Sequence, residues 1–496
     1  MQAHPSFSND VARSRRQFIR VGACSAAATL FASPLKWAVG ETLDEEVASS
    51  AAPQLQNRLR QELGEIGLVD AHEHLPHEGD WLSKGPDLVN LLGYSVVGDL
   101  QTAGMPQDAL QEEMNADAVW DAIAPYWAYV RNMGSARLLR RALSLFFDVD
   151  ELNRSVLRTV ETELSSLMQP GVYMNLLRQR HKIEVCLNVE GPPTVLDQPP
   201  FELFAPLLYT SIFANVQKRS DIQQVEEWSD VSVYSLDTYL QAVDEVIDRC
   251  VERGLVGIKW HQLAYLRDIH YAAPDRSQAE QCFNRILQMP AAGGLSSDTA
   301  VGFDRMRPFQ DLIQHHLVRR AIDFDMPVQI HTGILGLSRG AQISHTNPSH
   351  LTNLFLQYPT ARFDLLHVSY PYIRELTAIA KLFPNVYINT SWFEVLSPRA
   401  AKQYLREWLS SVPTNKILAF GGDQMNVLLS CASAEIVRDI LADALAEEVI
   451  AGNMSENQAV HTANALLRNN AWEYFRLERK WRNRDLSTLH DAQEVL

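Results

Sequence analysis

The fold is decided by residues 66–74, which read Ile66-Gly67-Leu68-Val69-Asp70-Ala71-His72-Glu73-His74. An apolar, β-branched run of this length predicts a strand over 66–71. Because alternate side chains of an extended chain point to the same side, both histidines can reach one cation. Such a pair also occurs as solvated surface residues, so its interpretation depends on what ends the other strands.

Seven further apolar runs follow, and most of them lead into a helical pattern. They are residues 183–189, 207–213, 255–260, 328–330, 363–366, 386–388 and 417–420. Strand-length runs that alternate with helices predict a parallel sheet. Eight parallel strands with intervening helices are what a closed barrel needs, so we predict an α/β fold of the TIM-like (β/α)8 type.

The predicted barrel covers residues 66–475 and carries one long insertion after its first strand. Residues 76–182 are rich in helix formers and aromatic side chains, and a connection of that length is more typical of a helical cap than of a loop. Residues 41–65 are predicted to be an N-terminal linker and residues 476–496 a C-terminal tail.

Metal-ligand side chains also follow three of the later runs. His331 comes after the fifth, His367 ends the sixth, and Asp423 follows the eighth. In a parallel barrel these strand ends converge on one mouth, so residues far apart along the chain become neighbours. Together with the first histidine pair, they predict a divalent-metal site at that mouth.

At these motifs the chain resembles the metal-dependent amidohydrolase superfamily, in its amidohydrolase-related branch, from about residue 66 to 475. The resemblance implies that His72, His74 and Asp423 bind the principal metal ion. It also implies that His331 and His367 bind that ion or a second one, or polarise the substrate. The motifs that carry it are Asp70-Ala71-His72-Glu73-His74, Gly257-Ile258-Lys259, Gln329-Ile330-His331-Thr332-Gly333, Leu366-His367-Val368-Ser369-Tyr370-Pro371 and Phe420-Gly421-Gly422-Asp423.

Lys259 stands where members of that superfamily with two metal ions often carry a carboxylated, bridging lysine. Carboxylation turns the cation into an oxygen ligand, whereas an unmodified lysine would bind an acidic group of the substrate. A structural, salt-bridged lysine is the third interpretation. Zinc suits histidine and aspartate ligands best, and manganese or iron fits the same site. One ion or two are both compatible with the motifs.

Weaker candidates lie on the loops beyond the strands. Arg267 and Tyr265 are candidates for binding a substrate carboxylate, with solvated loop residues as the alternative. Trp392, after the seventh run, is a candidate for lining the substrate pocket, with core packing as the alternative. Glu190, at the end of the second run, is a candidate to reach the metal, and His261 is interpreted as an ordinary histidine.

The preferred function is hydrolysis of an amide-like or ester-like bond in a small molecule by a metal-activated water. Asp423 would take a proton and return it to the leaving group, and His331 or His367 would stabilise the charge that develops on oxygen. Related barrels also decarboxylate aromatic acids or isomerise uronic acids, and the fold alone does not separate these reactions. A non-catalytic periplasmic binding protein is the remaining alternative.

Composition excludes several other classes of protein. The chain has 496 residues with 46% apolar content, enough for a large core. Lys and Arg number 44 against 60 Asp and Glu, and the net charge of -16 argues against a nucleic-acid partner or an anionic membrane surface. Beyond residue 40 the cysteines at 186, 250, 282 and 431 show no close spacing, so neither a zinc ribbon nor a disulfide framework is expected.

Residues 1–40 have a positive net charge, in contrast to the rest of the chain. Ser14-Arg15-Arg16-Gln17-Phe18, followed by a short, weakly apolar run over 21–32, resembles a twin-arginine export signal, with a disordered basic tail as the alternative. We therefore expect residues 1–40 to be a signal peptide read by the twin-arginine machinery, and the rest to be periplasmic or secreted. No later segment reaches 18 uninterrupted apolar residues, so no stable membrane anchor is expected, and a homo-oligomer is compatible with the sequence.

Overall fold

The centre of the fold is one parallel sheet of eight strands, which pair in chain order from β1 to β8. The computed structural model describes residues 41–198, 202–261, 266–289, 306–336 and 341–482, with the backbone alone over 41–51. The strands are β1 Leu68–Glu73, β2 Ile183–Glu190, β3 Phe204–Tyr209, β4 Gly257–Trp260, β5 Pro327–His331, β6 Arg362–Leu366, β7 Val386–Asn389 and β8 Ile417–Leu418. The predicted barrel is therefore confirmed.

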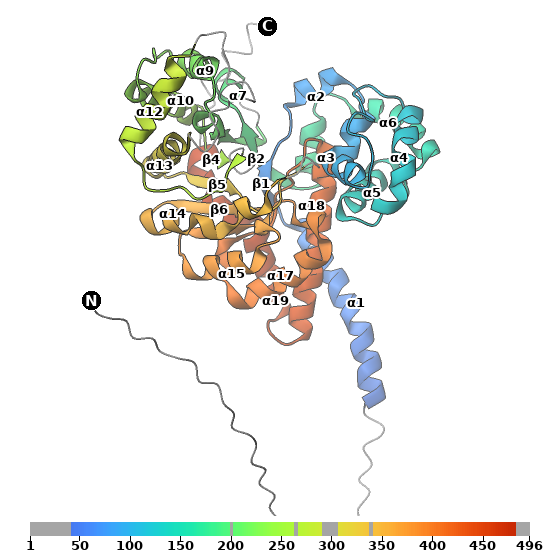
Figure 1. Cartoon of the computed structure of the whole chain (residues 1–496). Helices are drawn as coiled ribbons and strands as arrows, with labels where there is room; N and C mark the ends of the chain where they lie inside the picture. Colours follow the sequence, from blue (N-terminus) through green and yellow to red (C-terminus); the bar gives the residue numbers. More distant parts are fainter. Residues whose placement is uncertain (1–40, 199–201, 262–265, 290–305, 337–340, 483–496) are drawn as a thin grey trace, which may run out of the picture. The chain divides into compact units, whose positions relative to one another are not determined.

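The described helices precede, connect or follow these strands along the chain (Figure 1). They are α1 Glu41–Glu65, α2 Glu78–Lys84, α3 Leu88–Thr102, α4 Ala116–Val130, α5 Gly134–Phe147, α6 Arg154–Leu167, α7 Pro192–Asp197, α8 Ser211–Ala214, α9 Arg219–Ser229, α10 Leu236–Glu252, α12 Arg276–Leu287, α13 Arg307–Asp323, α14 Thr352–Gln357, α15 Ile373–Leu382, α16 Phe393–Leu396, α17 Pro398–Ser411, α18 Val427–Ile450, α19 Glu456–Asn464 and α20 Asn470–Tyr474. Shorter turns of helix are η1 Met174–Arg180, η3 Ile343–Thr346, η4 Pro348–Leu351, η5 His367–Ser369, η6 Thr414–Lys416, η7 Ala465–Asn469 and η8 Glu478–Arg482. No helix within the described ranges is long and apolar enough to cross a membrane.

Two backbone hydrogen bonds join the first strand to the segment after the last one. The Ala71 amide donates to the Phe420 carbonyl at 3.0 Å, and the Asp423 amide donates to the His72 carbonyl at 3.0 Å. These bonds nearly close the barrel, although no regular ladder links β8 to β1. They also set His72 and Asp423 side by side at the barrel mouth.

The opposite end of the barrel interior is filled by the C-terminal segment. Small and branched residues from several strands, such as Val69 and Leu207, form one cluster with Tyr474, Phe475 and Trp481. The Trp481 indole N–H donates to the Phe204 carbonyl at 3.1 Å, which satisfies its polar atom inside that cluster. The predicted tail thus begins as a packing element, and residues 483–496 lie outside the described part.

The insertion between β1 and β2 is helical throughout most of its length, as predicted. It contains α2 to α6 and η1, and the N-caps Asp87, Asn115 and Asn153 each accept a hydrogen bond from a backbone amide of the following turn. Helix α5 packs against α16 and α18, which follow β7 and β8. In Figure 1 the blue and teal helices of this insertion lie together beside α18.

Two boundaries differ from the sequence prediction. The third strand was expected over 207–213 but spans Phe204–Tyr209, because the apolar run continues past a turn at Thr210 into the short helix α8. The region 41–65, predicted as a linker, is the helix α1. Its residues Leu55, Leu59 and Leu63 recur every fourth position and are buried in the main core, which makes one apolar stripe.

Candidate metal centre

The first and last strands bring three predicted ligands together at the barrel mouth. His72 Nε2 lies 3.3 Å and His74 Nε2 3.4 Å from the same oxygen, Asp423 Oδ1. Beneath them, the buried Asp70 carboxylate accepts from the amides of His72 and Gly422, at 3.2 and 3.1 Å. A side chain at position 422 would collide with the Glu73 carboxylate, since an ideal Cβ there lies 2.0 Å from Glu73 Oε1. The glycine at 422 is thus needed for this close approach.

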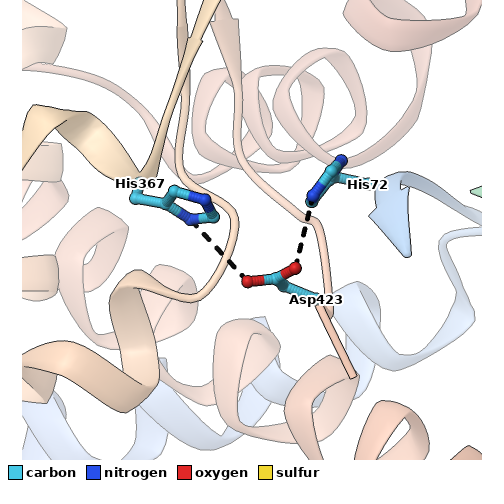
Figure 2. A group of neighbouring side chains, drawn as sticks. All are labelled: His72, His367 and Asp423. Atoms are coloured by element: carbon cyan, nitrogen blue, oxygen red, sulfur yellow. Dashed lines mark ion pairs between the residues drawn. The ribbon is translucent and has the colours of Figure 1, made fainter. Parts of the chain in front are cut away.

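His367 approaches the same carboxylate from β6. Its Nδ1 lies 3.9 Å from Asp423 Oδ2, and Figure 2 shows His72 and His367 on either side of the Asp423 carboxylate. One ligand atom from each of these three residues lies within 4.8 Å of the others, as a shared metal ion requires.

Left-handed backbone aims two of these side chains. His367, Val368 and Ser369 have φ values of 57, 48 and 54°, and Asp423 has a φ of 52°. Such a conformation costs about 1–3 kcal/mol for a non-glycine residue and persists only when neighbours fix it. The turn after β6 is fixed by the hydrogen bond between the Thr332 and Ser369 hydroxyls, at 2.7 Å. Strained residues gathered at one mouth are typical of a functional site.

The hydrogen bonds of His331 and His367 determine which of their nitrogens carry protons. His331 Nε2 lies 2.9 Å from the Ile334 carbonyl, and His367 Nδ1 lies 3.1 Å from the Ser391 carbonyl. A carbonyl oxygen only accepts, so both of these nitrogens must be protonated. In neutral rings the remaining nitrogens, His331 Nδ1 and His367 Nε2, are unprotonated and each carries a lone pair. These two nitrogens lie 3.1 Å apart, so their lone pairs face each other. A cation between or beside them would relieve this repulsion, so the donor set fits a metal ion.

Electrostatics keep the histidines neutral and the carboxylate charged. Burial, followed by the positive charge of Lys259, lowers the pKa of His72 to about 3, and burial chiefly lowers the pKa of His74 to about 4. Burial also lowers the pKa of His367 to about 3 and that of His331 well below its usual value. Burial by itself would raise the pKa of Asp423, but the neighbouring histidines more than offset that effect and hold it below its usual range. Neutral imidazoles and an ionised carboxylate are the forms that bind metals.

Lys259 reaches the same cluster from β4. Its Nζ lies 3.2 Å from His72 Nε2, and the side chain is 1% exposed. Burial lowers its pKa to about 7, while Asp423 and Asp364 act in the opposite direction. A lysine with this pKa is partly unprotonated at neutral pH, which is the form that either carboxylation or proton exchange needs.

A cavity of about 250 Å³ opens onto these residues. The described residues that line it are His72, His74, Tyr94, Lys259, His261, His331, Gly336, Trp392, Asp423 and Met425. Trp392 lines this cavity, where the sequence analysis placed it as one of two alternatives. A second cavity of about 480 Å³ shares His74 and Met425 with the first and is otherwise walled largely by residues of α2, α3 and neighbouring insertion segments.

Sequence reasoning assigned no role to four of the lining residues, of which Gly336 and Met425 bring no metal-binding or ionisable group and Tyr94 and His261 contact other site residues. Tyr94 comes from the insertion, and its hydroxyl donates to the Asp423 side chain at 3.0 Å. It follows Gly93, where α3 kinks with a φ of 74°. The His261 ring, interpreted from the sequence as an ordinary histidine, packs on the His331 ring with centroids 4.4 Å apart. A Gly-Tyr pair in a helical insertion carries no recognisable signal, whereas His261 lies two residues beyond Lys259 and could have been chosen on that ground.

Other candidates lie elsewhere. Arg267 was expected to bind a substrate carboxylate, but it is 1% exposed and pairs with Asp311 at 2.7 Å instead of lining the cavity. Its guanidinium is thus occupied by an internal carboxylate. Glu190 pairs with His77 at 3.3 Å and does not line the cavity either. Tyr265 lies outside the described residues.

Sequence comparison relates part of this chain to known proteins. Residues 231–459 match the amidohydrolase family model. The match supports the amidohydrolase superfamily and includes Lys259, His331, His367 and Asp423. Protein fluG of Emericella nidulans is 34% identical over 168 residues, which are 34% of this chain and 19% of that protein. The matched segment is therefore a small part of the relative's length.

Solved structures share the eight-stranded barrel fold at low sequence identity. Uronate isomerase from Thermotoga maritima is 16% identical with a TM-score of 0.71, over 85% of this chain and 97% of that one. Glucuronate isomerase from Caulobacter crescentus is 17% identical with a TM-score of 0.68, over 86% and 95%. A candidate metal-dependent hydrolase from Lactobacillus casei is 18% identical with a TM-score of 0.59, over 86% and 99%. These likenesses establish the fold.

Proposed function

We propose that this chain is a divalent-metal-dependent hydrolase of the amidohydrolase superfamily that acts on an amide-like or ester-like bond of a small molecule. The observation that carries the proposal is the convergence of His72 Nε2 and His74 Nε2 on the ionised Asp423 carboxylate, together with the facing unprotonated nitrogens of His331 and His367. Neutral histidines and a carboxylate at the mouth of a parallel barrel are the donor set of a hydrolytic metal.

A divalent cation bound there supplies a water whose pKa is lowered toward neutrality. Asp423 is ionised and lies beside His72 and His74, so it can accept the proton of the attacking water and return it to the leaving group. Lys259 Nζ is a donor that lines the cavity and can stabilise charge on the substrate oxygen, whereas the Tyr94 hydroxyl spends its one proton on Asp423 and so orients that carboxylate.

His331 and His367 fit the role of ligands better than the role of donors to the substrate. Each ring already donates its N–H to a backbone carbonyl, at Ile334 and Ser391. Only a lone pair remains for a partner, and a lone pair cannot hydrogen-bond to a developing oxyanion. This revises the expected role of His367 in charge stabilisation. Zinc suits the nitrogen-rich set best, manganese and iron also fit, and His331 with His367 offer donors for a second ion.

Metal analysis and product analysis together test the proposal. Protein produced with zinc, manganese and iron in the medium should retain at least one ion per chain by plasma mass spectrometry. A panel of small amides, esters and lactones, followed by mass spectrometry, should yield a new acid together with an amine or alcohol. A chain that retains none of the three metals, or that converts its substrate without uptake of water, would contradict the assignment.

Isomerisation of a uronic acid is the second candidate, because two uronate-type isomerases share the fold over 85 and 86% of this chain. In that reaction Asp423 and the Tyr94 hydroxyl would move protons between neighbouring carbons. Incubation with uronates distinguishes it, since an isomer of unchanged mass indicates an isomerase. Release of carbon dioxide from an aromatic acid would indicate a decarboxylase.

We also propose export by the twin-arginine machinery and a periplasmic or secreted location. Arg15 and Arg16, with Phe18 two positions after the pair, motivate this assignment, and they lie outside the described residues. A fusion of residues 1–45 to a reporter should leave the cytoplasm only when the twin-arginine system is intact. Replacing both arginines with lysine should retain the reporter inside, and unchanged export of that variant would refute the assignment.

A further inference from the structure

A polar layer crosses the barrel interior next to the candidate metal centre. Lys259 pairs in register with Gln329, and Gln329 pairs in register with Asp364, on strands β4, β5 and β6. Residues in register on parallel strands point to the same face, and these three are at most 1% exposed. Barrel interiors are normally filled by branched apolar side chains, so a buried polar layer requires a reason.

The hydrogen bonds of Gln329 fix the orientation of its amide. Its Nε2 donates to the Ala71 carbonyl at 2.7 Å and to Asp364 Oδ2 at 3.0 Å. Turning the amide over would place its oxygen against the Ala71 carbonyl, which only accepts. The amide oxygen must therefore face the remaining neighbour, which is His72 Nδ1 at 3.0 Å.

This orientation determines the tautomer of His72. Because Gln329 Oε1 is an acceptor, the neutral ring must carry its proton on Nδ1. The other nitrogen, Nε2, is then a lone pair directed at Asp423 Oδ1 and Lys259 Nζ, 3.3 and 3.2 Å away. Figure 2 shows one ring nitrogen of His72 facing Asp423 and the other turned away from it.

Asp364 in turn holds Gln329. Its Oδ2 also accepts from Asn389 Nδ2 at 3.3 Å, and Asn389 is itself oriented because its Oδ1 accepts from the Ser391 amide at 2.9 Å. Asp364 Oδ1 has no hydrogen-bond partner among the described residues. Asp364 therefore binds Gln329 and Asn389 through Oδ2 alone. An asparagine whose amide oxygen takes the place of Oδ2 would keep both hydrogen bonds.

We propose that Gln329, held by Asp364, is a positioning residue that locks His72 in the Nδ1–H tautomer and so presents the Nε2 lone pair to the metal site. The inference deepens the proposed function and rests on it for the identity of the ion. A partner on the outer nitrogen of a metal-binding histidine fixes its tautomer and ring orientation, and loss of such a partner lowers metal affinity by about 10- to 100-fold.

The test compares Gln329→Met with wild type, using zinc ions alone as the probe in competition with a chelator. Zinc affinity should fall about 10- to 100-fold. The matched control is Gln314→Met, because Gln314 is another fully buried glutamine, on α13, whose side-chain amide atoms have no partner within the part of the chain that the structure describes. Its zinc affinity should equal that of wild type. Asp364→Asn should retain most of the affinity, whereas Asp364→Leu should lose part of it.

A second readout does not depend on metal. Histidines labelled with ¹⁵N show by NMR which ring nitrogen is protonated, and the His72 signal is identified by its absence in His72→Ala. Metal-free wild type and Asp364→Asn should show Nδ1–H, and Gln329→Met should show a mixture or Nε2–H. Wild-type zinc affinity in Gln329→Met, or Nε2–H at His72 in metal-free wild type, overturns the inference. Should wild type bind no metal at all, the proposed function fails, and the tautomer still decides this inference separately.

Discussion

Replacing Lys259 with methionine should make the metal-free protein more stable at neutral pH. Burial lowers the pKa of this lysine from 10.5 to about 7 in the folded chain. Between those values the unfolded chain binds a proton that the folded chain does not, so stability rises with pH over that window. A methionine of similar volume removes the charge and therefore removes this dependence.

The size of the effect follows from the displacement of the pKa. Each unit corresponds to about 1.4 kcal/mol, and at pH 7, where the folded lysine is half protonated, the cost is about 4 kcal/mol. The methionine also loses the hydrogen bond between Nζ and His72, which is worth about 1 kcal/mol. We therefore expect Lys259→Met to gain about 3 kcal/mol at pH 7 and about zero near pH 10.

Urea denaturation of chelator-treated protein at several values of pH, followed by circular dichroism, measures this difference. Mass spectrometry of the same samples establishes that the lysine is unmodified. Lys402→Met is a suitable control, because Lys402 is on the surface, 38% exposed, and pairs with Glu447. Its effect should be small at every pH. A gain in Lys259→Met that is the same at pH 7 and pH 10, or a loss at pH 7, would refute the reasoning.

Four further variants and one surface control test other parts of the structure. His72→Ala and Asp423→Asn should each abolish stoichiometric zinc binding and lower turnover at least about 100-fold, while the circular dichroism spectrum stays unchanged. If either variant keeps its zinc, the replaced residue is not a metal ligand. Tyr94→Phe should lower kcat/KM about 10- to 100-fold, because one hydrogen bond to a charged group is worth about 1.5–3 kcal/mol, and an unchanged value would leave Tyr94 as a packing residue only. Leu59→Ala should cost about 2–5 kcal/mol of unfolding free energy, whereas Leu356→Ala, at a residue 72% exposed, should cost less than about 0.5 kcal/mol, and equal effects would contradict the packing of α1.

Much of the fold could be predicted because each strand is a short apolar run buried on both faces. Such runs stand out against the amphipathic helices between them, as at residues 183–189 and 363–366. The third strand was predicted to end four residues too late because Ile212 and Phe213 continue the apolar run after the chain has turned. The helix at 41–65 was missed because its apolar stripe is only three leucines long within a polar segment.

The site was predictable where chemistry follows a strand end. The sequence analysis named the side chains that now surround the Asp423 carboxylate, including His72 and His367, because parallel strands converge. Tyr94 was not predictable, because its place depends on how a long insertion packs back on the barrel. Arg267 was expected to bind a substrate carboxylate because it follows Lys259 closely in the sequence. Sequence proximity does not show which carboxylate pairs with a guanidinium, and in the fold that carboxylate is Asp311.

The two backbone hydrogen bonds between β1 and the segment after β8 bear on when the site comes into existence. His72 leaves the ribosome 351 residues before Asp423, so a long loop must close before the two residues meet. Closure of long loops is slow and comes late in folding. A nascent or truncated chain that lacks the last strand can therefore neither seal β1 nor assemble the complete donor set. Metal bound at the barrel mouth would then indicate that the entire barrel has formed, so the bound ion would distinguish folded barrels from incomplete ones.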